Sequence, residues 1–502
     1  MLNRVKHIIV FGGGTSGWLT AAYMVNKVKF PCKITVIEST SIGPIGVGEG
    51  TQPYTARFLH DAGLNPRDWM KPSAASFKYG VLLKGWNDNP YFVDNDFIEN
   101  NIMAPDLYPH DYFIGKDPQE LFDWMPACRL ALNNVSPKLG GFDHTISLDS
   151  FKDFGAVHFS AMDIVDTLRD LIKDKITYIN TNIVTINKDE NGITELIDDK
   201  GTSYTADLYL DCSGFKAKLI EETLGVPFTD ISDILPCDRA VAIPTEFKDP
   251  YKECHPYTES TTMKAGWRWK IPTFKRIGNG YVYSSKFITP EVAEQELREA
   301  IEEYDAPAKH LSMRCGSHQM VAYKNVVAIG LAAGFVEPLE ATGITFTTAM
   351  VETLTNLLNI HEGLWTPHPM KILNNHYGNV VTEIIAFVWA HYYYSTRSDT
   401  EFWKNIRNKK LEDAPEYIQI ILDQYNKMIT RSFFLNPKTS GFNSGQWFSM
   451  LNANNIYKEQ RKLTDAQLKY AEYYIKLKRN EIDQAIQTFP NHYEYLKEWY
   501  ND

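Results

Sequence analysis

Three glycines near the N-terminus have the spacing of a nucleotide-binding turn. The segment GGGTSG places Gly12, Gly14 and Gly17 in the order GxGxxG. Glycines at these positions permit a tight turn and a close approach to a pyrophosphate, which the following helix N-terminus binds through its backbone N–H groups. The residues predicted to contact the phosphates are Gly12, Gly14, Thr15, Ser16 and Gly17. The alternative is a glycine-rich turn without a ligand.

The elements around this turn favour the binding site. Residues 7–11 (HIIVF) form a continuous apolar run, typical of a buried parallel strand, and residues 17–28 have helical spacing. Residues 33–38 (KITVIE) form a second β-rich run that ends at Glu38, 21 residues after Gly17, where a carboxylate can accept ribose hydroxyls. A single fingerprint of this kind leaves no second site for a nicotinamide cofactor, so the pattern favours FAD.

Other candidate residues have an ordinary structural explanation beside the chemical one. Lys78 shares one strand face with Gly80 and Leu82, and the pattern alone indicates a solvent-facing lysine. Glu340 precedes a helix, and the ordinary explanation is an acid that stabilises the helix dipole. The chemical explanation is a catalytic carboxylate, and Glu337 is the other candidate for that role.

The helix start after Glu340 is a second candidate for an anion site. Thr342 is expected to be an ordinary N-cap, yet Thr342 and Gly343 together would also expose N–H groups to a halide. In GWRWKIP (266–272), strand alternation puts Trp267 and Trp269 on one face, and two core tryptophans are the simple interpretation.

Composition limits the classes of partner. The 502 residues are 44% hydrophobic and 23% charged, with a net charge of −11 and no basic run, which argues against nucleic acid or an anionic membrane as partner. No apolar stretch approaches the length of a membrane span, and the N-terminus is interpreted as a strand and not as a signal peptide. Six scattered cysteines without a CxxC pair indicate reduced thiols in a cytoplasm and no metal site.

The pattern along the chain predicts an α/β protein with two domains. Residues 1–360 are expected to form an FAD-binding, Rossmann-like core, with an insertion at 85–150 and a β-rich section at 236–288. Residues 361–502 are expected to form a mostly helical region that covers the substrate. The late segment VVAIGLAAG, which contains Gly330 and leads to Pro338, is a second candidate for contact with the flavin.

Several segments together resemble the flavin-dependent halogenases of the tryptophan-halogenase type, over most of residues 5–405. In chain order they are GGGTSGW, IGVGEGTQP (45–53), FKYGVLLKGW (77–86), DCSGF (211–215), GWRWKIP, NGYVYSS, FVEPLEATG (335–343) and HYYYSTRSDTEFW (391–403). Single matches of this kind are moderate evidence, whereas all of them in order are strong evidence.

The resemblance implies roles for the candidate residues. Gly48 and Glu49 would lie near the flavin, Lys78 would be the lysine that directs the halogen, and Glu340 the active-site glutamate. Thr342 and Gly343 would bind a halide (chloride, bromide or iodide). The two indoles would separate the flavin from the substrate, and hypohalous acid would travel from the flavin to the substrate through an internal tunnel.

The implied enzyme uses reduced FAD from a separate flavin reductase, with oxygen and a halide, to halogenate an electron-rich aromatic compound of indole or phenol type in secondary metabolism. An aromatic hydroxylase is the alternative, and a non-catalytic flavin-binding scaffold a third; a homo-oligomer is compatible with the sequence. The tail beyond about residue 405 departs from the family pattern and offers isolated Phe442, Trp447 and Asn452, so we expect free tryptophan to be a poor substrate. Leu331 and Ala341 are smaller departures.

Overall fold

The chain folds into two compact units, which are described separately. The computed structural model describes residues 4–41, 48–94, 103, 107–136, 156–430, 442, 444–457 and 462–501. Unit 1 comprises residues 1–75, 159–233 and 313–381, and unit 2 comprises residues 76–158, 234–312 and 382–502. Neither unit is continuous in sequence, and the expected boundary at residue 360 falls inside unit 1.

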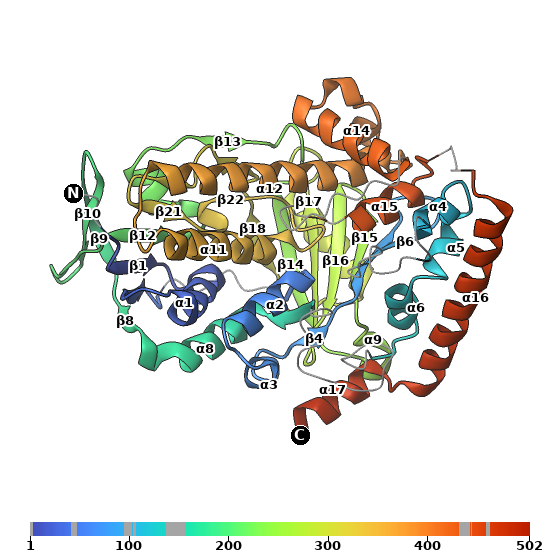
Figure 1. Cartoon of the computed structure of the whole chain (residues 1–502), viewed down its shortest axis with the longest axis horizontal. Helices are drawn as coiled ribbons and strands as arrows, with labels where there is room; N and C mark the ends of the chain where they lie inside the picture. The colour runs from blue at the N-terminus through green and yellow to red at the C-terminus, as the bar shows by residue number, and fades with distance from the viewer. Residues whose placement is uncertain are drawn as a thin grey trace. The chain divides into compact units, whose positions relative to one another are not determined.

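Unit 1 is built on a six-stranded sheet (Figure 1). Its strand order is β20 (Ala322–Tyr323), β21 (Val326–Ala328), β12 (Leu208–Asp211), β1 (His7–Phe11), β2 (Lys33–Glu38) and β8 (Thr177–Asn180). All neighbours are parallel except β20 and β21. The first strand is buried almost completely, as its continuous apolar run predicts.

The predicted βαβ unit is present in unit 1. The helix α1 (Thr15–Lys27) connects β1 and β2, and it packs against α8 (Ala161–Ile172) and α11 (Thr342–Ile360). The apolar stripe of α11 is buried, with Leu354 and Leu358 both fully inaccessible. Two small sheets complete the unit, in the orders β11–β10–β9 (Ser203–Tyr204, Gly192–Asp198, Ile183–Asp189) and β13–β19–β22 (Phe228–Asp230, Gly316–His318, Gly334–Phe335).

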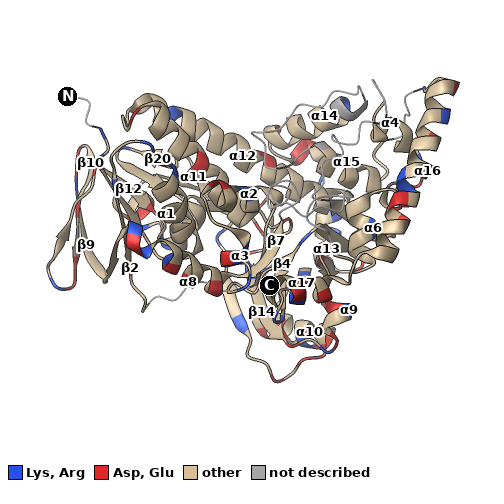
Figure 2. Ribbon diagram, turned by 60° about the horizontal axis from the view of Figure 1, so that its bottom comes forward, with Lys and Arg blue, Asp and Glu red and all other residues tan. Residues whose placement is uncertain are grey.

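Unit 2 is built on a seven-stranded sheet. Its order is β18 (Lys309–Ser312), β14 (Arg239–Thr245), β17 (Ile277–Tyr283), β16 (Gly266–Pro272), β15 (Thr258–Met263), β5 (Gly80–Lys84) and β6 (Tyr91–Asp94). The four strands β14 to β17 lie within the expected β-rich section, and only the β15–β5 pair is parallel. On one face, Val241, Ile243, Tyr281 and Tyr283 form a core with α10 (Pro290–Ile301), near which acidic and basic residues gather (Figure 2).

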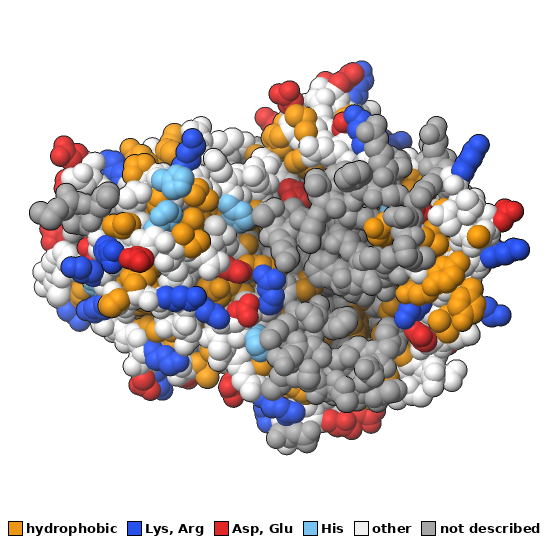
Figure 3. Space-filling view, viewed as in Figure 1, with side chains coloured by type: hydrophobic (Ala, Val, Ile, Leu, Met, Phe, Trp, Pro, Cys, Tyr) orange, Lys and Arg blue, Asp and Glu red, His pale blue; other side chains and the backbone are white. Residues whose placement is uncertain are grey.

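The C-terminal region of unit 2 is helical, as expected. Its helices are α13 (Glu401–Arg407), α14 (Glu416–Thr430), α15 (Ser444–Ala453), α16 (Asp465–Thr488) and α17 (His492–Asn501), and α12 (Pro367–Tyr394) runs across the division between the units. Hydrophobic side chains line the outer side of α16 (Figure 3), where Tyr470, Tyr473 and Leu477 are exposed. None of the described helices is long and apolar enough to cross a membrane.

The expected insertion at 85–150 contains regular structure that its low periodicity did not predict. The described residues of the insertion include three short helices, α4 (Pro109–Phe113), α5 (Pro118–Phe122) and α6 (Pro126–Leu132). Each begins with proline, whose fixed φ suits the first helical position. In α5 the carboxylate of Asp117 also accepts a hydrogen bond from the backbone N–H of Gln119. Residues 95–102, 104–106 and 137–155 of the insertion lie outside the described residues.

Candidate active site

The glycine turn in unit 1 has the close approaches that its sequence predicts. A Cβ on Gly12, whose φ is +123°, would lie 2.3 Å from the carbonyl oxygen of Cys212, and one on Gly17 would lie 2.0 Å from the carbonyl oxygen of Gly12. A Cβ on Gly14 would meet no atom within 4 Å. This residue precedes the first turn of α1, which receives no side-chain cap. The turn is therefore tight on its protein side and open where a pyrophosphate would lie.

Glu38 lies at the end of β2, beside this turn. A Cβ on Gly13 would lie 1.4 Å from Oε2 of Glu38, so the glycine makes room for the carboxylate. The hydroxyl of Tyr178 donates to Oε1 of Glu38 at 2.6 Å, and Nε1 of Trp18 lies 3.4 Å from Oε2. These contacts fix the carboxylate at the position expected for a ribose contact.

The late segment around Gly330 is brought to the same turn. A Cβ on Gly330, whose φ is +66°, would lie 2.1 Å from Oγ of Ser16, and this Oγ is 3.3 Å from Oγ1 of Thr347 on α11. The carbonyl of Ala333, three residues later, accepts hydrogen bonds from the hydroxyl of Tyr377 (2.7 Å) and from the backbone N–H of His318. Two predicted cofactor segments, 314 residues apart in sequence between Ser16 and Gly330, are thus adjacent in unit 1.

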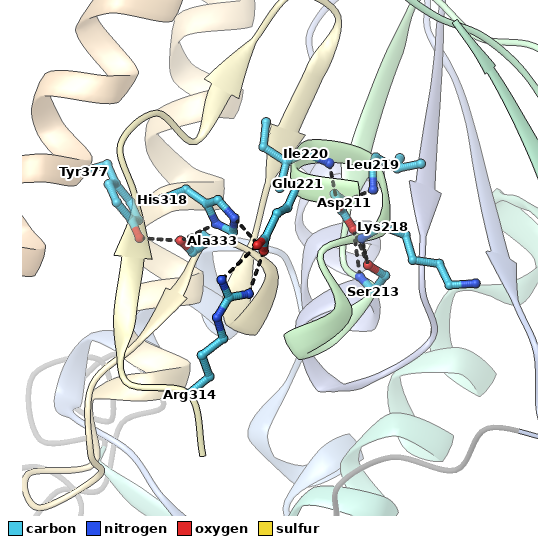
Figure 4. A network of polar contacts seen from close by, with 10 residues as sticks. All are labelled: Asp211, Ser213, Lys218, Leu219, Ile220, Glu221, Arg314, His318, Ala333 and Tyr377. Carbon is cyan, nitrogen blue, oxygen red and sulfur yellow. Dashed lines mark hydrogen bonds and ion pairs between the residues drawn. The ribbon is translucent and has the colours of Figure 1, made fainter. Parts of the chain in front are cut away.

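Two carboxylates of unit 1, those of Glu221 and Asp211, hold neighbouring segments of the chain together through hydrogen bonds (Figure 4). Both oxygens of Glu221 accept hydrogen bonds from Arg314, at 2.6 and 2.8 Å, and Oε2 also lies 3.1 Å from Nε2 of His318. The fully buried Asp211, in the DCSGF segment, accepts hydrogen bonds from the backbone N–H groups of Leu219 and Ile220 at 2.8 and 2.9 Å. Burial raises the pKa of Asp211, although these donors counteract the shift.

The segment that contains Glu49 contacts the segment that contains Glu340. The side-chain amide of Gln52 donates to the carbonyl oxygen of Glu340 at 2.8 Å, and the backbone N–H of Gln52 donates to Oγ1 of Thr345. Burial raises the pKa of Glu49, in β3 (Gly48–Gly50), to about 7. Residues 45–47 of this loop lie outside the described residues. The Glu340 side chain is fully buried, and so is that of its competitor Glu337, so burial does not separate them.

The start of α11 differs from the simple expectation. Thr342 is not the N-cap, because the helix begins at Thr342 itself and Ala341 takes the capping position with a left-handed φ of 55°. No side chain caps the first turn, and it contains no acidic residue. A Cβ on Gly343 would meet no atom within 4 Å. The helix N-terminus therefore combines open space with N–H groups that no side chain satisfies, which suits an anion.

Lys78, in unit 2, is not the solvent-facing lysine that strand alternation indicates. The continuous strand expected there is divided into β4 (Ser76–Phe77) and β5, and Lys78 lies in the two-residue break between them with 1% of its surface exposed. Its backbone N–H donates to the carbonyl of Ala156 at 2.9 Å, and that of Tyr79 donates to Pro256 at 2.7 Å. Because of this break, Lys78 does not take part in the alternation of side chains between the two faces of the seven-stranded sheet.

Buried histidines surround this break. Nε2 of His158 lies 2.9 Å from Oγ1 of Thr258, and Nδ1 of His492 lies 2.7 Å from the carbonyl oxygen of Cys254. Burial lowers the pKa of His158 well below its usual range, and the positive charge of Lys78 lowers it further. Burial also lowers the pKa of His255 to about 3 and that of His492 to about 4. Lys78 therefore lies among imidazoles that are neutral at pH 7.

The two indoles of β16 lie on one face of the sheet, as predicted. Trp267 and Trp269 are buried, with ring centroids 6.3 Å apart and planes inclined at 59°. Their Nε1 atoms have no hydrogen-bond partner among the described residues. Trp269 pairs with Gly280 on β17, and a Cβ there would lie 2.0 Å from Cζ2 of the indole. The bare backbone of Gly280 therefore supports the ring of Trp269.

A family model described as tryptophan halogenase matches residues 7–469. The chain belongs to this family. It is 30% identical to the 7-chloro-L-tryptophan 6-halogenase KtzR of a Kutzneria species, over 97% of this chain and 98% of the relative. It is 32% identical to the tryptophan 6-halogenase SttH of Streptomyces toxytricini, over 81% of this chain and 82% of that protein.

Solved structures agree with this assignment. The crystal structure of SttH from S. toxytricini covers 99% of this chain with a TM-score of 0.87 at 27% identity. BrvH, a flavin-dependent halogenase from Brevundimonas sp. BAL3, covers 99% of this chain with a TM-score of 0.84 at 27% identity. The chain is therefore a flavin-dependent halogenase with the mixed α/β fold predicted from its sequence, and these relatives lend no support to the hydroxylase alternative.

The predicted site residues of this halogenase fall into two groups, one in each unit. Unit 1 brings together the glycine turn, Glu38 and Gly330, and separately joins the Glu49 loop to the segment with Pro338, Glu340, Thr342 and Gly343. Unit 2 contains Lys78, Trp267 and Trp269. Sequence reasoning missed Gln52 and Gly280 as supporting residues, although both lie inside quoted motifs.

The C-terminal aromatic residues of the halogenase are not isolated, in contrast to our expectation. The ring of Trp447 stacks on Tyr425 with centroids 4.3 Å apart, and Phe442 stacks on Phe387 at 3.9 Å. Both side chains are buried, as is Asn452. Phe442 and Trp447 are thus part of the packing of unit 2. Residues 431–441 and 443, in the same segment, lie outside the described residues.

Proposed function

We propose that this halogenase binds FAD in the glycine turn of unit 1. Gly12, Gly14, Thr15, Ser16 and Gly17 would hold the pyrophosphate, and Glu38 the ribose, with Gly48, Glu49, Gly330 and Pro338 beside the flavin. The fit is supported by the open space at Gly14 and by the first turn of α1, which no side chain caps. When bound, reduced FAD from a separate reductase supplies the activation of oxygen that oxidises the halide.

The halide, in this proposal, binds at the N-terminus of α11. The N–H groups near Thr342 and Gly343 carry the partial positive charge of the helix dipole, and no acidic side chain in the first turn opposes it. A residue larger than glycine at position 343 would fill the open space. The same geometry accepts chloride, bromide or iodide.

Lys78 is assigned to halogen transfer and Glu340 to general base catalysis at the arene. A buried ammonium donates hydrogen bonds to hypohalous acid, or as an amine carries the halogen, and so directs it to one carbon. Glu340 would remove the proton that the arene loses. Trp267 and Trp269 are assigned to separating the flavin from the arene, and their mutual contact makes them a continuous apolar wall.

The burial of Lys78 is the observation that carries this assignment, because lysine is among the side chains that are least often fully buried. Lys78→Ala is expected to abolish halogenated product while oxygen still reoxidises the flavin. Lys84→Ala is the matched control, since Lys84 is partly exposed and pairs with Glu259 at 2.6 Å. The assay is product by mass spectrometry together with flavin reoxidation by absorbance. Wild-type product formation by Lys78→Ala would refute the assignment.

We further propose an electron-rich indole or phenol as substrate, with free tryptophan a poor one. An amino acid requires groups that bind both its ammonium and its carboxylate, and residues 433–455 contain no Asp or Glu and a single cation, Lys438. Phe442 and Trp447, moreover, are used in internal packing. Competition kinetics between tryptophan and simple indoles, phenols and anilines test this. A clear preference for tryptophan, with one regioisomer formed, would contradict it.

A further inference from the structure

The sheet that carries the indole pair has a charged opposite face. Along β16, Arg268 and Lys270 alternate with Trp267 and Trp269, so the cationic side chains project away from the indoles. The helix α10 packs over β14 and β17 on this charged face. Beside it lies a pocket of about 760 Å³, a size typical of small-molecule sites.

The central acid of this pocket is already neutralised. The carboxylate of Glu259, on β15, accepts hydrogen bonds from Nζ of Lys84 at 2.6 Å and from Arg268 at 3.3 Å. The hydroxyl of Thr261 donates to the same carboxylate at 3.0 Å. The charge of Glu259 is thus balanced by Arg268 within the pocket lining and by Lys84 outside it.

Four more acids line the pocket, Glu246, Glu253, Glu302 and Glu303, and three of them are occupied by hydrogen bonds or an ion pair. Oε2 of Glu253 accepts hydrogen bonds from the backbone N–H groups of Lys248 and Asp249, at 2.6 and 2.9 Å. Glu302 pairs with the Lys248 ammonium at 3.0 Å, and both of these side chains are exposed. Glu246 is the one lining acid whose side chain makes no hydrogen bond or ion pair in the described part of the chain, and the charge of Glu253 still acts on Lys270.

Two cations on the pocket lining have no such partner. The side chains of Lys270 and Arg276 make no hydrogen bond or ion pair within the described part of the chain. Lys270 is partly buried, and burial lowers its pKa, although the charges of Glu259 and Glu253 counteract the shift. An ammonium in this environment is stabilised by an anionic oxygen that replaces the lost water.

Apolar side chains complete the lining. Phe247 follows strand β14, Ile277 begins the adjacent strand β17, and Ile301 ends helix α10. The pocket therefore combines these apolar side chains with the two unpaired cations, Lys270 and Arg276. A simple inorganic ion would contact only the cations and leave the apolar part of the pocket empty.

We infer that this pocket binds a small organic anion, whose carboxylate or phosphate is held by Lys270 and Arg276 and whose apolar body packs on Phe247, Ile277 and Ile301. The site is separate from the proposed halogenation chemistry, because Lys270 projects from the sheet face opposite to Trp269. Its occupant contacts the strand that carries both indoles.

The test is isothermal titration calorimetry on the full-length protein with benzoate and phenyl phosphate, and with benzamide as the neutral control. Benzoate or phenyl phosphate should bind saturably, and benzamide should not; the tighter of the two anions identifies the preferred acid group. Lys270→Met keeps the aliphatic stem and should weaken binding about 10- to 100-fold, because a charge-assisted hydrogen bond is lost. Lys264→Met, at an exposed lysine paired with Glu296, should leave the affinity unchanged.

A second variant guards against misfolding. Arg276→Met removes the other cation and should also weaken binding, and circular dichroism checks that each variant is folded. If Lys270→Met does not fold, Arg276→Met decides the question. The inference is overturned if neither anion binds the wild-type protein saturably. It is equally overturned if the folded variants bind with wild-type affinity, since the anion would then occupy another site.

Discussion

Replacing Gly280 by alanine tests whether the bare backbone of β17 sets the position of the Trp269 indole. The new Cβ would lie 2.0 Å from Cζ2 and 2.1 Å from Cη2 of the ring, whereas ordinary contact begins at 3.4 Å, so the indole must move by about 1.4 Å. The paired backbones of β16 and β17 cannot separate without loss of ladder hydrogen bonds. We expect Gly280→Ala to lower the free energy of unfolding by about 1–3 kcal/mol.

The same variant should reduce the coupling of the reaction, measured as halogenated product per flavin reoxidised, because the displaced indole no longer closes the wall with Trp267. Trp269→Phe removes Cζ2 and Cη2, the two nearest of the three clashing ring atoms, so the double variant should recover part of the lost stability in a thermodynamic cycle. Gly378→Ala is the control, since its Cβ meets no atom within 4 Å. If Gly280→Ala keeps both wild-type stability and wild-type coupling, the glycine does not position the indole.

Two further predictions concern buried polar groups. The folded-state pKa of His492, about 4, lies below its ordinary value of 6.5, so the unfolded state gains the proton first and stability is lost as the pH falls below 6.5. From pH 7 to pH 5 this loss is about 2 kcal/mol. Urea unfolding should show that His492→Gln is less stable than the wild type at pH 7, and that the difference in free energy of unfolding is smaller by this amount at pH 5. A difference that stays the same at both pH values would contradict the argument. Asp211→Ala leaves the N–H groups of Leu219 and Ile220 without their acceptor and should lower the free energy of unfolding by about 2–4 kcal/mol. The control Asp189→Ala, at an exposed turn residue, should lower it by less than about 1 kcal/mol. Equal losses in the two variants would show that the burial of Asp211 is unimportant.

The parts of the fold that local patterns determine were predicted from the sequence. The βαβ unit, the indole strand and the C-terminal helices follow from apolar periodicity, and the glycine turn from the steric demands on Gly12 and Gly17. Their recognition needs only a short window of sequence. The proposed roles of Lys78 and Glu340, in contrast, depended on resemblance, because periodicity alone predicts an exposed lysine and an ordinary first-turn acid.

Other features depend on partners distant in sequence. Strand alternation could not reveal the break at Lys78, because it arises where the chain leaves one sheet for another. Gln52 is 288 residues from the carbonyl that it contacts, and Gly280 has meaning only opposite Trp269. The N-cap at Ala341 was missed because its left-handed φ is unusual for alanine and no side-chain pattern indicates it.

The interleaving of the two units has a consequence for synthesis on the ribosome. Ile8 of the central strand β1 pairs with Leu208, and Val81 pairs with Thr258, so these strands must wait for partners 200 and 177 residues downstream. At typical translation rates that interval is roughly 10–40 s, during which the apolar strand HIIVF has no neighbour on one side. Neither unit is complete before residue 381 has been made. Nascent chains should therefore engage chaperones for a long time, and a fragment that ends before residue 381 should fail to fold.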